Sequence, residues 1–139
     1  MKQFAIALFV ALAFGLTACG VSDTRVMQAA QVEANEFNFL PATIEVEAGK
    51  PVKLTLLNKG TVEHDFSVIE ILVSDVKTTS DSHGHEMSAM AIQPKLHVAA
   101  VAKKSSVIEF TPTRPGTYDV LCTVAGHKEA GMVAKLIVK

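Results

Sequence analysis

The chain of 139 residues carries a formal net charge of −1 at pH 7, from 13 Lys and Arg against 14 Asp and Glu. Its length suggests one domain, and its charge gives no basis for binding nucleic acid. A composition of 49% hydrophobic and 19% charged residues excludes a disordered chain. With no Trp and one Tyr, the core must be built from aliphatic residues and Phe.

The first 18 residues have the features of a secretory signal peptide. A basic start at Lys2 precedes an apolar run over residues 4–16, and small residues follow that run. The run is too short for a helix that spans a bilayer, and the order of its parts is that of a cleaved signal. We therefore expect that residues 1–18 are removed and that the protein is exported.

The signal ends in Leu16-Thr17-Ala18-Cys19, which resembles a bacterial lipobox, where the cysteine is lipidated and becomes the mature N-terminus. We expect a lipid anchor at Cys19, on the outer face of a bacterial membrane or in the periplasm, and a linker over residues 19–34. An ordinary signal peptide with an incidental cysteine is the alternative. Once Cys19 is lipidated, Cys122 is the one thiol left in an exported chain, which indicates a reactive or metal-bound residue.

Residues 35–139 are predicted to form a β-domain, because hydrophobic and polar residues alternate there with a period of two. Turn signals separate the runs, as at residues 48–51, 58–60 and 112–116. The expected strands lie at about residues 37–39, 44–46, 52–57, 62–69, 98–101, 107–110, 118–122 and 132–138. About eight short strands without a convincing helix predict an all-β fold, a two-sheet antiparallel sandwich.

Cys122, His127 and Met132 lie close together at the end of an expected strand, with the spacing C-x4-H-x4-M. Taken singly, a buried cysteine or methionine is usually an ordinary core residue. A thiolate, an imidazole and a thioether in one loop instead form a soft ligand set that suits copper. A blue copper site needs two imidazoles and one thiolate in a plane, with a weak axial thioether. The second histidine must come from elsewhere, and His64, after the strand at 52–57, is the candidate.

Residues 75–94 have little strand character and contain His83, His85, Met87 and Met90. A polar surface loop with chance histidines is the simpler interpretation. The alternative is a second, weaker copper site, since imidazole and thioether both bind copper. His97, within the next expected strand, is predicted to face solvent.

Three segments resemble the cupredoxin family of blue copper proteins: residues 35–58, the tetrapeptide E-H-D-F at 63–66, and G-T-Y-D-V-L-C-T-V-A-G-H-K-E-A-G-M at 116–132. The gap of four residues between Cys122 and His127 is similar to that of long-loop members such as auracyanin and rusticyanin. The resemblance implies a Greek-key sandwich, one type 1 copper per domain, and an edge of the His127 ring that reaches the surface as the electron path.

Asp65 stands where this family often has Asn, the residue that ties the two ligand-bearing loops together. We expect Asp65 to bond to the backbone near Thr123, whereas Asn58 is expected to be only a turn residue. Lys128 and Glu129 cancel in formal charge beside His127, so we expect transient apolar docking rather than strong electrostatic steering.

The first functional hypothesis is a monomeric, non-enzymatic carrier of single electrons between membrane-associated redox partners, such as c-type cytochromes or a terminal oxidase. The alternative is a copper-binding protein for storage or delivery, with the segment around His83 and Met90 as its capture arm. A complete cage of thiolate and two imidazoles favours the carrier, because a donor of copper needs exchangeable ligands. Four protein ligands on one copper would leave no position for a substrate, which argues against an enzyme.

Overall fold

The computed structural model describes residues 26–79 and 93–139, in which every regular element is a β-strand. These described residues form ten strands in chain order: β1 (Gln28–Asn35), β2 (Asn38–Leu40), β3 (Thr43–Val46), β4 (Val52–Asn58), β5 (His64–Val68), β6 (Val73–Thr79), β7 (Leu96–Ala100), β8 (Ser105–Pro112), β9 (Gly116–Leu121) and β10 (Val133–Val138). Over these two ranges, no helix is long and apolar enough to cross a membrane. The signal sequence and Cys19 lie outside the described residues, as do His83, His85, Met87 and Met90.

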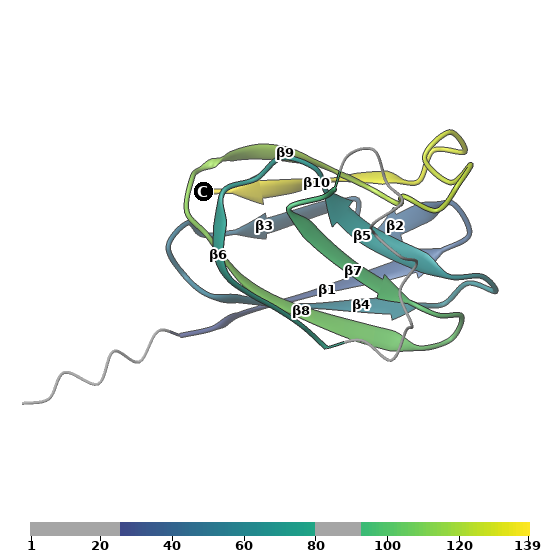
Figure 1. The fold of residues 1–139 in the computed structure, drawn as a ribbon, viewed down its shortest axis with the longest axis horizontal. Helices are drawn as coiled ribbons and strands as arrows, with labels where there is room; N and C mark the ends of the chain where they lie inside the picture. Colours follow the sequence, from purple (N-terminus) through teal and green to yellow (C-terminus); the bar gives the residue numbers. More distant parts are fainter. Residues whose placement is uncertain (1–25, 80–92) are drawn as a thin grey trace, which may run out of the picture.

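The strands form two five-stranded sheets that face each other as a sandwich (Figure 1). One sheet has the order β2-β1-β4-β8-β6, and the other has the order β3-β10-β9-β5-β7. The predicted all-β sandwich is confirmed, but its sheets are mixed, because β1 pairs with β4 and β3 pairs with β10 in parallel. The chain passes from the first sheet to the second at the cis Leu40–Pro41 bond.

Strand β1 occupies residues 28–34 of the segment 19–34 that was expected to be a linker. It lies between β2 and β4 and runs parallel to β4 from Gln28, opposite Val52, to Ala34, opposite Asn58. Only Val32 and Ala34 are buried in the core, with Ala30 partly buried against it, so the hydrophobic alternation is too short to stand out in a stretch of small and polar residues. The ordered domain therefore begins before residue 35.

Strand β6 was not expected, since residues 75–94 were predicted to have little strand character. It is the edge strand next to β8, and six of its seven residues are exposed. A register shift between Ser74 and Lys77 interrupts the pairing. An exposed edge strand with a bulge has no hydrophobic period to read, which explains the wrong prediction.

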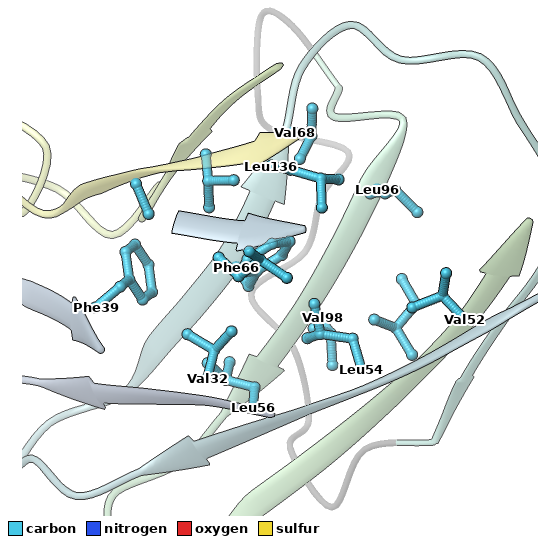
Figure 2. Close-up of a cluster of buried hydrophobic side chains, with 14 of the residues drawn as sticks. Val32, Phe39, Val52, Leu54, Leu56, Phe66, Val68, Leu96, Val98 and Leu136 are labelled. Carbon is cyan, nitrogen blue, oxygen red and sulfur yellow. The ribbon is translucent and has the colours of Figure 1, made fainter. Parts of the chain in front are cut away.

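Residues of both sheets fill the space between them (Figure 2). Leu54 and Leu56 of β4 face Phe66 of β5 and Leu136 of β10, and each of the four is at most 1% exposed. Burial of such a side chain stabilises the fold by about 1.5–3 kcal/mol. This aliphatic core has the composition that the sequence predicted, and it anchors the strands that carry the chemistry.

Candidate metal centre

His64 is the first residue of β5, and a short loop after β4 sets its position. Asn58 closes this loop: its side-chain amide donates to the carbonyls of Val62 and Ala100, each at 2.7 Å, and its oxygen accepts from Gly60 N at 2.8 Å. Asn58 is fully buried. Asn58 was expected to be only a turn residue, but its side chain also holds the loop that positions His64. The sequence Asn-Lys-Gly shortly before the histidine was the local signal that could have indicated this role.

Cys122 directly follows β9, the neighbour of β5 in the sheet. The loop from Cys122 to Met132 folds back on itself, as Cys122 N donates to Met132 O at 3.2 Å and Met132 N donates to His127 O at 2.9 Å. Gly126 and Gly131 have φ angles of +84° and +98°, which side-chain-bearing residues rarely adopt. The backbone of the loop thus brings its three candidate ligands together at one end of the sandwich.

The donor atoms of three side chains converge at this end. The Nδ1 atoms of His64 and His127 are 3.2 Å apart, and His127 Nδ1 is 3.4 Å from Cys122 Sγ. All three donor atoms lie within 4.8 Å of one another, and all three residues are buried. Both imidazoles thus present the same ring nitrogen to the sulfur.

Met132 is fully buried at the end of the same loop and belongs to the core cluster. Its backbone bonds to Cys122 and to His127 hold it next to both of them. Met132 is therefore a candidate for the fourth, weak thioether ligand. Of the sequence-predicted ligands in the described part of the chain, His64, Cys122, His127 and Met132 all lie in this region.

Burial dominates the electrostatics of the centre. It raises the pKa of the Cys122 thiol to about 12, with a further contribution from the nearby charge of Asp65. Burial also lowers the pKa of His64, as does the proximity of His127. At neutral pH the metal-free site therefore holds a thiol and a neutral imidazole at His64, an uncharged arrangement that suits a dry environment.

Asp65 links the two ligand-bearing segments, as predicted. Thr123 N lies 3.0 Å from both oxygens of the Asp65 carboxylate, and Thr123 Oγ1 donates to Oδ2 at 2.8 Å. In the opposite direction, Asp65 N donates to Cys122 Sγ at 3.5 Å, and the thiol lies 3.7 Å from Asp65 Oδ2. These hydrogen bonds connect Asp65, which follows His64, with Thr123, which follows Cys122.

The other nitrogen of the His64 ring, Nε2, is buried and has no hydrogen-bond partner among residues 26–79 and 93–139. It packs on Gly60, where an added Cβ would lie only 2.7 Å from Nε2 and 3.1 Å from Glu36 Oε1. Glu36 itself accepts from Thr61 N at 2.6 Å. Glycine at position 60 therefore leaves room for the ring in the orientation that turns Nδ1 toward the sulfur.

Phe37 covers the His127 ring, with the two ring centres 5.3 Å apart and the planes at 87°. His127 is only 8% exposed, so little of the ring edge expected at the surface reaches it. Phe37 was predicted to lie in a half-buried strand, but it sits in the turn between β1 and β2 with a φ of +63° and is 46% exposed. Alternation alone does not reveal such a turn, and a bulky residue with positive φ is uncommon.

His97 does not simply face solvent, as was expected. Its Nδ1 lies 2.8 Å from Ser67 Oγ and 3.9 Å from Asp65 Oδ1, and its side chain is 18% exposed. It therefore belongs to the surroundings of the metal centre without being near enough to be assigned as a ligand.

The donor set fits copper. One sulfur and two imidazole nitrogens from three buried side chains match the trigonal thiolate-diimidazole site of blue copper proteins. A hard cation such as Mg²⁺ or Ca²⁺ would instead require oxygen ligands.

Comparison with known proteins agrees with this chemistry. The sequence model of the cupredoxin-like domain family matches residues 5–138. The copper-resistant cuproprotein CopI of Rubrivivax gelatinosus is 34% identical over 113 residues, which cover 78% of this chain and 64% of that protein. CopI of Pseudomonas aeruginosa is 29% identical over 153 residues, covering 91% and 83% of the two chains. The chain thus spans somewhat under two thirds of the Rubrivivax relative.

Among solved structures, reduced auracyanin from Roseiflexus castenholzii superposes with a TM-score of 0.62 at 18% identity, over 81% of this chain and 97% of that one. At this identity the likeness concerns the fold alone. The match of the family model over nearly the whole chain and the convergent thiol and imidazoles lead to one conclusion: this chain is a member of the cupredoxin-like family, and its metal is copper.

Proposed function

We propose that this protein is an exported copper protein that carries single electrons between membrane-associated redox partners. Its copper ligands are His64, Cys122, His127 and Met132. The observation that carries the proposal is the convergence of three soft donors, which lie within 4.8 Å of one another at one end of a rigid sandwich. Ligands fixed by a rigid fold need little rearrangement when the metal changes oxidation state, which keeps the barrier to electron transfer low.

The surroundings of the ligands support this function. His64, Cys122 and Met132 are fully buried, so water has little access to the copper. Four protein ligands fill the coordination expected of such a site and leave no position for a substrate. When bound, copper supplies the one-electron redox couple, and the chain's own residues hold the geometry and exclude water.

The surface next to the site suits brief contact with another redox protein. Phe37 is about half exposed and packs edge-on against His127, so an incoming partner would meet an aromatic ring in contact with a ligand. Lys128 and Glu129 are both exposed beside it and cancel in charge. We propose c-type cytochromes or a terminal oxidase as the class of partner, with the protein held near them by a lipid at Cys19.

Copper storage or delivery is the second candidate function. It is favoured by the names of the two CopI relatives, which are copper-resistant cuproproteins, and by the sequence pattern at His83, His85, Met87 and Met90. In that case copper would leave for an acceptor, whereas a carrier retains its metal through many redox cycles.

Challenge of the copper-loaded protein with excess Cu(I) chelator separates the two functions. An electron carrier keeps its copper while it exchanges electrons rapidly with a small c-type cytochrome, and it does so equally in a variant with His83→Ala and His85→Ala. The visible band and metal analysis after gel filtration measure the retained copper. Rapid transfer of copper to the chelator, slowed by the double substitution, would contradict the carrier function and support delivery.

Copper binding should release one proton from Cys122. Since burial and Asp65 raise the pKa of this thiol to about 12, a proton competes with the metal at every pH below that value. The copper affinity should therefore rise by about tenfold for each pH unit gained near neutrality. The lowered pKa of His64 means that this ring adds no proton release at neutral pH.

Calorimetric titration with copper in buffers of different ionisation enthalpy counts the released protons. We expect about one proton for the wild type and none for Cys122→Ser. A wild-type protein that binds copper without proton release would show that Cys122 is not the ligand, or that it is ionised beforehand.

Substitution of Gly60 should weaken the site through His64. In Gly60→Ala the new methyl group would lie 2.7 Å from His64 Nε2, so the ring must move away from the sulfur. We expect the copper affinity to fall by about 10–100-fold, the range found for residues that orient a ligand. Competition titration against a calibrated chelator measures this loss.

The neighbouring exposed residue offers a matched control, since Lys59→Ala adds no atom beside the ring. It should bind copper like the wild type. Equal affinity for Gly60→Ala and Lys59→Ala would contradict the role of Gly60 in seating His64.

A further inference from the structure

A chain of hydrogen bonds runs from the Asp65 carboxylate beside Cys122 to a histidine on the edge strand of the sheet. Ser67 Oγ donates to Asp65 Oδ1 at 2.6 Å, and the same hydroxyl lies 2.8 Å from His97 Nδ1. Ser67 and Asp65 are 0% and 1% exposed. The series of contacts therefore runs from the Cys122 thiol through the Asp65 carboxylate and the Ser67 hydroxyl. It ends at the partly exposed imidazole of His97.

The strand geometry produces this alignment. Asp65 and Ser67 are two residues apart on β5, so their side chains lie on the same face of the sheet. His97 is the register partner of Ser67 on β7, which places the two side chains opposite each other. Because β7 is the edge strand of its sheet, the imidazole connects the buried carboxylate with the rim of the fold.

The number of available protons fixes the direction of the bonds. Asp65 accepts from Thr123 N and from two hydroxyls, the arrangement of a carboxylate that acts only as an acceptor. The single proton of Ser67 is then directed to Asp65, so the hydroxyl accepts from His97, and Nδ1 of that ring carries the hydrogen. Each donor in the chain points toward Asp65.

The two oxygens of Asp65 have different surroundings. Oδ1 receives the Ser67 hydroxyl, whereas Oδ2 faces Cys122 Sγ at 3.7 Å and receives the Thr123 hydroxyl. A negative charge this close to a metal-bound thiolate disfavours reduction of the metal, since reduction adds an electron. Donors on the far oxygen draw part of this charge away from the sulfur, and they also fix the orientation of the carboxylate.

We propose that Ser67 and His97 are positioning residues of the copper centre, which hold Asp65 in place and set the reduction potential through it. This inference rests on the proposed ligand set, in which Cys122 binds copper as a thiolate. Both residues are linked to Cys122 through the Asp65 carboxylate, and we expect them to act on the metal by this route. Through these two residues, the hydrogen-bond network around the copper site reaches from the two ligand-bearing segments to the edge strand β7.

The test is redox titration of the copper-loaded protein, with the charge-transfer band and the EPR spectrum recorded for each variant. His97→Phe and Ser67→Ala remove one link each, and both should lower the potential and shift the band. His97→Asn places an amide donor near the position of Nδ1, and Ser67→Thr keeps the hydroxyl, so both should restore wild-type values. Lys95→Gln, an exposed position two residues before His97 on the same chain segment, is the control and should change neither property.

A double variant tests whether the effect passes through the chain of bonds. Since His97 acts through Ser67, adding His97→Phe to Ser67→Ala should lower the potential no further than Ser67→Ala alone. In the metal-free protein, nitrogen-15 NMR should show hydrogen on His97 Nδ1 in the wild type. Additive shifts, or an Nδ1 without hydrogen, would overturn the proposed direction of the chain.

The spectra distinguish a failure of the proposed ligand set from a failure of the positioning role alone. If the wild type gives no thiolate charge-transfer band, the proposed ligand set fails and the inference falls with it. If the wild type is blue but His97→Phe and Ser67→Ala leave the potential and spectra unchanged, the ligand set stands and the positioning role is wrong. A fall in thermal stability with unchanged spectra would likewise assign Ser67 and His97 to the fold alone.

Discussion

The bond between Asp65 and Thr123 holds together the part of the molecule on which the metal centre depends. His64 is the first residue of β5, and Cys122 belongs to the loop after β9, so these two candidate ligands are far apart in the chain. The carboxylate of Asp65 accepts both the N–H and the hydroxyl of Thr123, while Asp65 N–H donates to the cysteine sulfur. Each ligand is thereby fixed relative to the other by the residue that follows it.

A buried carboxylate beside a thiol is a costly arrangement, and the structure shows how it is stabilised. Donors from Thr123 and Ser67 replace the water that an exposed carboxylate would bind. The same burial keeps Cys122 protonated until a metal displaces the proton. The site therefore combines a closed, apolar end of the sandwich with one polar network, and only a bound cation can neutralise the thiolate that forms there.

Much of this centre could be read from the sequence, because its signals are local. Cys122, His127 and Met132 lie within one short loop, and soft donors at that spacing have few other uses. The linking role of Asp65 was predicted from the resemblance to cupredoxins, which often have Asn directly after the first histidine. The alternating pattern predicted most of the strands. The expectation that all of them pair antiparallel was wrong for β1 with β4 and for β3 with β10.

What the sequence did not show depends on pairing between distant segments. Strand β6 carries no hydrophobic period, and β1 buries only Val32 and Ala34, so neither stands out. Phe37 fits an alternating strand pattern but lies in a turn against His127. His97 acquires its role only through its register with Ser67, which no local pattern encodes.

A copper site built on the Cys122 thiolate can be tested by titration of the metal-free protein with Cu(II), followed by visible absorption and EPR. We expect an intense blue band that saturates at one equivalent of copper, with the narrow copper hyperfine splitting of a thiolate site, and its complete loss in Cys122→Ser. A pale signal that continues to grow beyond one equivalent and survives Cys122→Ser would contradict it.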